Sequence, residues 1–283
     1  MRYLVTLCLL AAVACYAGTR CTWTGVGRVV AVGDVHGDFR RFAEILRHAG
    51  LIDLEKNWCG GKTHLVQTGD LLDRGPDSRD VMDLLMKLEK QAPLQGGAVH
   101  CLTGNHEAMN LTGDYRYVSH GEAASYGGMK QLVRSLRPTG RYGRWLSGHS
   151  SVIMVNNAVF LHGGISDRYA EVPMAELNGE VSKRLSLSCD SADVLGGHGP
   201  LWYRGWVNDR SSSVERALET FLENAGADYA VVGHTVTDNG IETRFAGRVV
   251  MIDTGLSELY GGPGLYLEMN GRGYKVIDPG RGE

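Results

Sequence analysis

Three short polar segments, each directly after an apolar run, constrain the fold of this 283-residue chain more than any other feature. They are Gly-Asp-Val-His-Gly at 33–37, Gly-Asp-Leu-Leu-Asp-Arg-Gly at 69–75 and Gly-Asn-His-Glu at 104–107. Their Asp34, Asp70 and Asn105 are 36 and 35 residues apart, about the length of one β-α-β unit. Adjacent parallel strands would bring the three side chains to one edge of a sheet, where open α/β folds bind ligands.

The residues between these segments fit that arrangement. Apolar runs at 28–32, 63–68 and 98–103 predict strands, and helical spacing of apolar residues predicts helices over 39–49 and 78–91. This order favours a parallel sheet with right-handed crossovers. Further along, we expect a helix over 121–137, a strand pair at 150–155 and 158–162, a helix over 212–225, and strands at 229–233, 248–253, 265–269 and 274–277.

The beginning of the chain has the pattern of a secretory signal peptide. Arg2 precedes an apolar run over 3–17, and Ala12-Val13-Ala14 is typical of a cleavage site. The run is too short to span a bilayer comfortably. We therefore expect a signal peptide over about 1–17, one domain over 25–283, and a protein of the secretory pathway, extracellular or periplasmic, without stable membrane insertion. A buried first helix and a lipoprotein box ending at Cys15 are the alternatives.

Four cysteines remain after such cleavage, and export would place them in an oxidising compartment. Cys101 lies in an apolar run, where a buried free thiol is expected. A disulfide between Cys21 and either Cys59 or Cys189 stays open. Because the chain has no Cys-x-x-Cys pair, its sequence gives no support for a structural zinc site.

Two later histidines, His162 and His234, also adjoin glycines at the ends of predicted strands. Together with the three segments they supply carboxylate, imidazole and amide groups, the mixture that holds two divalent ions. Two adjacent ions with a nearby histidine and arginine can hydrolyse phosphate esters. The formal net charge of −3 gives no electrostatic case for nucleic acid as a partner.

These motifs resemble those of the phosphoprotein phosphatase branch of the calcineurin-like metallophosphoesterases. The matching segments are the three above, His-Gly-Gly at 162–164 and Gly-His-Thr at 233–235, and the resemblance spans about residues 29–255. Within that branch, residues 104–118 and 199–204 are similar to the bacterial-type, Shewanella-like phosphatases. The resemblance implies an α/β metallophosphoesterase sandwich: two mixed sheets flanked by helices, with a βαβαβ metal-binding core.

The resemblance also implies a role for each matching residue. Asp34 and His36 would bind the first ion, Asp70 would bridge both, and the second would be completed by Asn105, His162 and His234. Such ligands suit manganese, expected to support activity in vitro, with iron or zinc as alternatives.

For catalysis, His106 would protonate the leaving oxygen, and Asp73 would fix its ring. Arg74 and Arg204 would bind the phosphate, with Arg210 as an alternative to Arg204.

The sequence thus predicts a dinuclear-metal phosphomonoesterase, a monomer acting on phosphorylated proteins or small phosphomonoesters. The resemblance favours phosphotyrosine over phosphoserine or phosphothreonine. The alternatives are a diadenosine polyphosphate hydrolase and a catalytically inactive phosphate-binding protein.

Several other residues carry weaker expectations. Arg116 and Tyr117 are candidates for substrate contact or for packing, and His198 is a candidate pocket residue. Trp202 and Trp206 are expected to fill the core. The glycosylation sequon at 110–112 is expected to stay unmodified because a glycan there would obstruct the cleft. The remaining histidines are expected to be structural: His48, His64, His100, His120 and His149.

Overall fold

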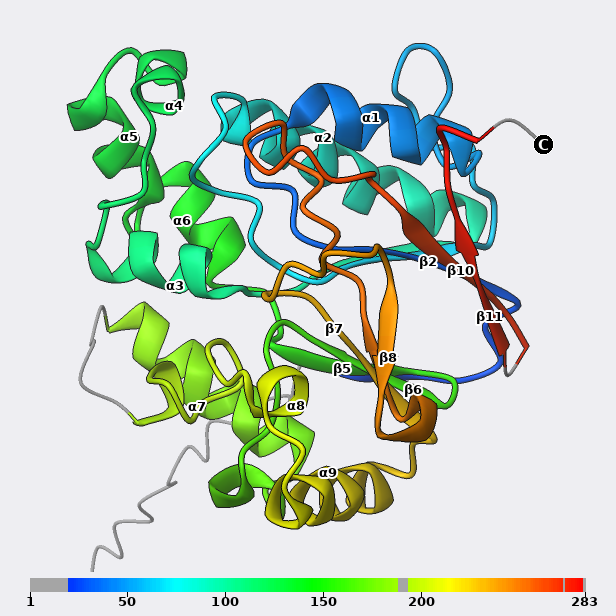
Figure 1. Cartoon of the computed structure of the whole chain (residues 1–283). Helices are drawn as coiled ribbons and strands as arrows, with labels where there is room; N and C mark the ends of the chain where they lie inside the picture. The colour runs from blue at the N-terminus through cyan, green and yellow to red at the C-terminus, as the bar shows by residue number, and fades with distance from the viewer. Residues whose placement is uncertain (1–19, 188–192, 272, 282–283) are drawn as a thin grey trace, which may run out of the picture.

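Two β-sheets face each other in the middle of the molecule, and helices cover their outer faces (Figure 1). The computed structural model describes residues 20–187, 193–271 and 273–281. The predicted signal peptide at 1–17 lies outside these residues. Within the described ranges, no helix is long and apolar enough to cross a membrane. The predicted sandwich of two mixed sheets flanked by helices is confirmed.

The first sheet contains the three strands that precede the polar segments. Its strand order is β11-β10-β2-β3-β4, with β2, β3 and β4 parallel and β10 antiparallel to both neighbours. Helices α1 and α2 connect the parallel strands and cover the outer face, as Figure 1 shows, so the βαβαβ core is confirmed. The bounds are β2 Arg28–Val32, α1 Phe39–His48, β3 His64–Gln67, α2 Ser78–Gln91, β4 Ala98–Cys101, β10 Tyr266–Asn270 and β11 Gly273–Ile277.

The second sheet has the order β1-β5-β6-β7-β9-β8, in which β6, β7 and β9 are parallel. Helices α7, α8 and α9 lie on its outer side (Figure 1). Four elements here were not expected from the sequence: β1, α7, α8 and β8. The bounds are β1 Thr22–Trp23, β5 Val152–Val155, β6 Ala158–Leu161, α7 Met174–Ser186, α8 Gly205–Asn208, α9 Ser212–Ala225, β7 Tyr229–Val232, β8 Glu242–Arg244 and β9 Val249–Met251.

Side-chain alternation along the strands explains why the sheets pack together. On β2, Val29 and Ala31 face the opposite sheet, where they meet Phe160 and Val231, whereas Val30 and Val32 pack with the helices. All of these side chains are fully buried. Both faces of the strands are therefore covered, as their nearly continuous apolar sequences predict.

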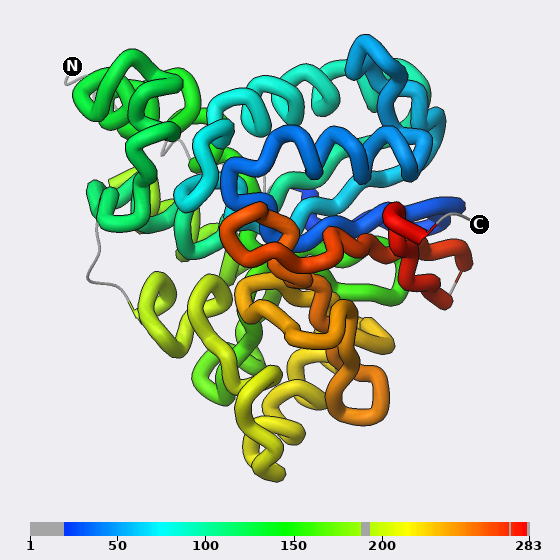
Figure 2. The backbone as a smooth tube through the Cα atoms, turned by 45° about the horizontal axis from the view of Figure 1, so that its top comes forward, coloured from blue at the N-terminus to red at the C-terminus, as the bar shows by residue number. Residues whose placement is uncertain are grey.

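The segment between β4 and β5 is helical and stands beside the sandwich, at the left of Figures 1 and 2. The expectation of one helix over 121–137 was wrong, because the chain forms two helices there. Gly127 and Gly128 separate them with φ of 84° and 114°, a conformation that interrupts a helix and that glycine adopts readily. The bounds are α3 Asn105–Thr112, α4 His120–Ser125, α5 Met129–Leu136 and α6 Arg141–Leu146, and short 3₁₀ helices lie at Ala92–Gln95, Asp167–Tyr169, Asp193–Leu195 and Phe245–Gly247.

Three cysteines lie in the described part of the chain, and all three are free thiols. The disulfide between Cys21 and Cys59, which the sequence left open, is therefore not formed. Cys101 is buried, as expected. Cys189 lies outside the described residues.

Candidate metal centre

All six predicted metal ligands gather where the carboxyl ends of parallel strands from both sheets meet. Asp34, Asp70 and Asn105 follow β2, β3 and β4. His162 follows β6 directly, and His234 follows β7 after one glycine. Equal strand registers, with Val32 opposite Gln67 and Gln67 opposite Cys101, align these ends. None of the six is more than 6% exposed: Asp34, His36, Asp70, Asn105, His162 and His234.

The backbone at the site is held in an unusual conformation. Five non-glycine residues here have positive φ: His36, Asp70, Asp73, Arg74 and His234. Each such residue costs on the order of 1–3 kcal/mol and persists only where its surroundings hold it. Here the carbonyl of Asp70 accepts hydrogen bonds from the N–H groups of Val35 and His36, at 3.0 and 2.9 Å. The first two motifs therefore fix each other's backbone.

The glycines of the motifs leave room for the carboxylates. A Cβ at Gly104 would lie 2.2 Å from Asp70 Oδ1, and one at Gly233 would lie 2.3 Å from Asp34 Oδ1. Both positions therefore need glycine for steric reasons.

The two oxygens of Asp70 point to different histidines. Oδ2 lies 3.6 Å from His36 Nε2, and Oδ1 lies 3.3 Å from His162 Nε2. His162 Nε2 is also 2.9 Å from Asn105 Oδ1. A carboxylate placed between two groups of donors can bridge two ions, which is the role predicted for Asp70.

The structure divides the donors slightly differently from the prediction. One close group is His36, Asp70 and His106, and the other is Asp70, His162 and His234. Asp34 contacts the second group: its carboxylate accepts from the His234 N–H, and Oδ1 is 3.9 Å from His162 Nδ1. All the predicted ligands are thus within one cluster.

Backbone carbonyls orient the rings. His36 Nδ1 lies 2.9 Å from the Leu72 carbonyl, and His162 Nδ1 lies 2.9 Å from that of Thr68. These contacts leave Nε2 of both rings as the ligand atom. His234 is held the other way, because its Nε2 is 3.2 Å from the Trp202 carbonyl, so Nδ1 remains to bind.

The charges of the cluster fit divalent cations. Burial, followed by the charges of Asp253 and Asp70, raises the pKa of Asp34 well above its usual range. Burial lowers the pKa of His36 to about 4 and that of His234 to about 2. Buried acids that repel each other, beside histidines kept neutral, are the donor set that two bound cations would stabilise.

The predicted acid, His106, has the partner expected of it. His106 Nδ1 lies 2.5 Å from Asp73 Oδ2. Burial alone would lower the pKa of His106, but the charge of Asp70, the hydrogen bond that the ring donates to Asp73 and the charge of Asp73 raise it. A raised pKa keeps the ring protonated, as a general acid requires.

Asn110 completes this pair. It is fully buried, and its Nδ2 donates to both oxygens of Asp73 at 3.1 Å. Asn110 is also the asparagine of the glycosylation sequon at 110–112, so the nitrogen that would carry a glycan already donates hydrogen bonds to Asp73.

Two glutamates support the motif loops and were missed by sequence reasoning. Glu107 accepts hydrogen bonds from the N–H groups of Gly104, Asp70 and Leu71, all at 2.8 Å. Glu122 accepts from the N–H of Asp73 at 3.2 Å. Glu107 could have been recognised, because an acid three residues after a helix N-cap often bonds back to the preceding loop.

The two predicted phosphate-binding arginines both lie at the cluster. The Arg74 guanidinium stacks 4.2 Å from the centre of the Tyr117 ring, and its buried Nε has no hydrogen-bond partner among the described residues. Arg204 Nη1 donates to the His234 carbonyl at 2.8 Å, so this arginine also holds the backbone of a predicted ligand. Arg210 is exposed beyond α8.

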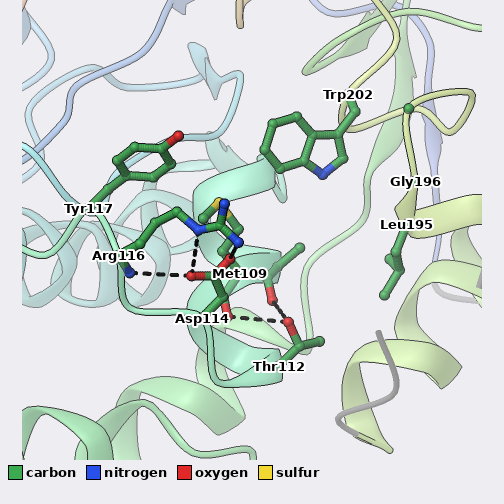
Figure 3. A pocket seen from close by; sticks show the side chains of 10 residues that line it. Met109, Thr112, Asp114, Arg116, Tyr117, Leu195, Gly196 and Trp202 are labelled. Carbon is green, nitrogen blue, oxygen red and sulfur yellow. Dashed lines mark hydrogen bonds and ion pairs between the residues drawn. The ribbon is translucent and has the colours of Figure 1, made fainter. Parts of the chain in front are cut away.

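A pocket of about 320 Å³ adjoins the cluster, with aromatic side chains on two of its sides (Figure 3). The Tyr117 ring lies 5.2 Å from that of His106, and the Trp202 ring lies 5.8 Å from that of His234. Arg116 lines the same pocket and forms an ion pair of 2.6 Å with Asp114. Met109, Thr112, Leu195 and Gly196 form much of the remaining wall.

Two expectations about neighbouring residues need correction or completion. Trp206 fills the core as predicted, whereas Trp202 is only partly buried and also lines the pocket. The expectation that Trp202 only fills core was therefore incomplete. His198 is exposed, and its carbonyl accepts from Ser166 Oγ at 2.8 Å.

Comparison with known proteins agrees with the site. The family model described as calcineurin-like phosphoesterase matches residues 27–238. Shewanella-like protein phosphatase 1 of Plasmodium berghei is 32% identical, over 89% of this chain and 74% of the relative. Shewanella-like protein phosphatase 2 of Arabidopsis thaliana is 29% identical, over 82% and 72%.

Among solved structures, the cold-active protein-tyrosine phosphatase of a psychrophilic Shewanella species superimposes with a TM-score of 0.81. It is 29% identical, and the match covers 92% of this chain and 80% of that one. The chain belongs to the calcineurin-like phosphoesterase family and is a metal-dependent protein phosphatase of the Shewanella-like type.

Proposed function

We propose that this phosphatase hydrolyses phosphotyrosine in preference to phosphoserine and phosphothreonine, and that small aryl phosphates are also substrates. The observation that carries the proposal is the pocket with Tyr117 and Trp202 on its walls next to His106. The Shewanella relative, described as a protein-tyrosine phosphatase, gives independent support.

The cluster would hold two divalent ions through the six predicted ligands. When bound, these ions supply an activated water and offset the charge of the phosphate. Their oxygen and imidazole donors favour manganese, iron or zinc over calcium. We propose manganese as the ion that supports activity in vitro.

The protein's own groups manage the phosphate and the leaving oxygen. Arg74 stacks on Tyr117, and its buried Nε has no hydrogen-bond partner among the described residues, so we propose that this guanidinium binds a phosphate oxygen and offsets charge in the transition state. His106 donates its Nε2 proton to the departing oxygen, while Asp73 fixes the ring through Nδ1. Because phenol has a pKa of about 10, a tyrosine oxygen needs less protonation than a serine oxygen.

The position of His106 also places the leaving group. The departing oxygen must lie within hydrogen-bond reach of His106 Nε2, so the group attached to it extends past the Tyr117 ring and into the pocket. An aromatic ring there packs against Tyr117 and faces Trp202, contacts that a serine side chain is too short to make.

A comparison of three substrates tests the proposal. Metal-stripped protein resupplied with manganese is given a phosphotyrosine peptide, the same peptide with phosphoserine, and diadenosine tetraphosphate. We expect manganese-dependent phosphate release, fastest from phosphotyrosine and lost in Asp70→Asn and His106→Asn. Faster release from phosphoserine would contradict the preference, and cleavage of the dinucleotide alone would assign the protein to the polyphosphate hydrolases. Absence of turnover with metal bound would support a phosphate-binding role.

We further propose that residues 25–283 act as one monomeric domain exported by an N-terminal signal peptide. The apolar run at 3–17 and the small residues around 12–14 support export. Expression of the whole chain in a secreting host, followed by N-terminal sequencing of the product, tests this. A product that retains Met1 and stays inside the cells would contradict it.

A further inference from the structure

A second group of metal-binding side chains lies outside the predicted centre, where α2, β4 and the segment after α6 meet. Glu89 belongs to α2, Cys101 ends β4, and His149 follows α6. A carboxylate oxygen, the Cys101 sulfur and a His149 ring nitrogen all lie within 4.8 Å of one another. We propose that these three side chains form a separate site for zinc or a similar thiolate-binding divalent ion.

The three donors are those that zinc uses in proteins. Zinc binds thiolate, imidazole and carboxylate, and in a tetrahedral site with usual bond lengths these atoms are about 3.3–3.8 Å apart. Glu89 Oε1 and His149 Nε2 are already 3.1 Å apart. Three protein ligands leave a fourth position for water. Because thiolate is a poor ligand for magnesium, calcium and manganese, the site would select a different ion from the phosphatase centre.

Neighbouring groups orient two of the ligands. Trp145 Nε1 donates to Glu89 Oε2 at 2.6 Å, which leaves Oε1 to face His149. The indole of Trp145 also packs edge-on against the His149 ring, at a centroid distance of 4.5 Å. Such outer contacts hold metal ligands in their binding orientation.

Backbone hydrogen bonding holds the contributing segments together. The N–H of Thr103, two residues after Cys101, donates to the carbonyl of Ser150 at 3.1 Å. An ion at this site would fasten α2, β4 and this segment to one another. It would do so at the end of β4, four residues before Asn105 of the predicted phosphatase centre.

Binding of a cation at this cluster requires the Cys101 thiol to lose its proton. Burial, together with the charge of Glu89, raises the pKa of the Cys101 thiol well above its usual range. Without an ion the sulfur is therefore protonated, and binding forms the sulfur–metal bond as the thiol proton leaves to solvent. His149 binds through the lone pair of Nε2, with its proton on Nδ1. One thiolate and one carboxylate then balance the two positive charges of the ion.

The site is also open to solvent. The side chains of Glu89 and His149 are 24% and 12% exposed, so an ion can reach Cys101 past them. Sequence reasoning missed this cluster because its members are 12 and 48 residues apart and form no motif.

Cobalt binding tests the proposal, because a thiolate bound to Co²⁺ gives a charge-transfer absorption band in the near ultraviolet. The predicted phosphatase centre contains no sulfur ligand and gives no such band. Titration of the reduced, metal-stripped full chain should produce a band whose final intensity corresponds to one thiolate-bound Co²⁺ per chain, and zinc should abolish it. We expect the band to be lost in Cys101→Ser and kept in Cys59→Ser and Asp70→Asn.

A second pair of variants keeps the thiol and tests the other contacts. His149→Gln and Trp145→Phe should each weaken cobalt binding at least about tenfold, as loss of a ligand or of its orienting partner does. No charge-transfer band in the wild-type chain would overturn the proposal, as would a band that survives Cys101→Ser. Unchanged cobalt affinity in His149→Gln would overturn the ligand set. All outcomes are read from binding, so they are independent of phosphatase activity.

Discussion

Histidines are buried both at the predicted metal centre and within the strands behind it, yet their surroundings differ. At the centre, the pKa of His36 is lowered to about 4 and that of His234 to about 2, in each case first by burial. Burial likewise lowers the pKa of His100, on β4, to about 3. A depressed histidine pKa is therefore common to both regions.

The two regions differ in whether a carboxylate lies near the histidine and in the backbone conformation of the histidine. His36 faces Asp70 at 3.6 Å and lies in a loop with positive φ. His100 instead pairs with His64 at 3.0 Å and packs against the Trp23 ring at 4.2 Å. Among the described residues, neither His64 nor His100 forms an ion pair with a carboxylate. At the predicted centre, loops with positive φ hold carboxylates against the imidazoles, whereas the His64–His100 pair has neither feature.

The largest expected effect that separates the two regions is on activity. Asp70→Asn removes the charge shared by both donor groups and should lower kcat by at least about 10²–10³-fold, the loss typical of removing one charge-stabilising group. His100→Asn, also buried but without an ion pair to a carboxylate among the described residues, should leave kcat within about twofold of wild type. Manganese-dependent hydrolysis of an aryl phosphate measures both. Equal losses in the two variants would abolish the distinction.

The loss of rate on removing the predicted acid, His106, should depend on the leaving group. His106→Asn should lower kcat by about 10²–10⁴-fold, the usual contribution of general acid catalysis. The loss should be greater for phosphoserine than for phosphotyrosine, because an alkoxide leaves less easily than a phenolate. A series of aryl phosphates whose phenols differ in acidity provides the measurement. A loss of the same size for every ester would show that His106 acts before the ester bond breaks.

Glu107 tests what holds the strained loops. In the wild type, both carboxylate oxygens of Glu107 accept hydrogen bonds from backbone N–H groups. Glu107→Gln leaves only one acceptor oxygen, and the loss of charged hydrogen bonds should lower the free energy of unfolding by about 3 kcal/mol. Denaturant unfolding of the metal-free protein measures this. Glu44→Gln, on the exposed face of α1, is the matched control and should change stability by less than about 0.5 kcal/mol. Similar values for both variants would mean that Glu107 does not hold the loops.

The smallest effect concerns the histidine pair on the strands. The pKa of His100 is lower in the folded than in the unfolded state, so unfolding takes up a proton below pH about 6.5. The stability contributed by the neutral ring is complete above that pH and falls as pH drops towards about 3. At pH 5 the loss is about 2 kcal/mol.

His100→Gln removes this titration while it keeps a side chain able to reach His64. The variant should therefore lose less stability than wild type between pH 7 and pH 5, as measured by denaturant unfolding with metal present. If the stability of wild type and that of His100→Gln fall equally between pH 7 and pH 5, His100 is not the group that titrates.

Most of the fold, and the gathering of the six predicted ligands in one place, followed from the sequence because each motif is local. In each motif, a strand is followed closely in the chain by a glycine and then by an aspartate or asparagine. The parallel registers of β2, β3 and β4 bring these equally spaced side chains together. The split of 121–137 into two helices was harder to foresee, because Gly127 and Gly128 are compatible with either a helix or a break. Hydrogen bonds between residues far apart in the chain, such as that of Glu122 with the Asp73 N–H, leave no local pattern in the sequence.

The buried amide of Asn110 has a consequence for producing this protein in a host that glycosylates. Oligosaccharide is attached to the extended chain before it folds, whereas the Nδ2 of Asn110 is needed afterwards to bind Asp73. A chain that receives the sugar cannot bury that nitrogen, so helix α3 cannot close over Asp73. Modified molecules would remain misfolded and be retained, and the secreted enzyme would consist of the molecules that folded before the sugar arrived.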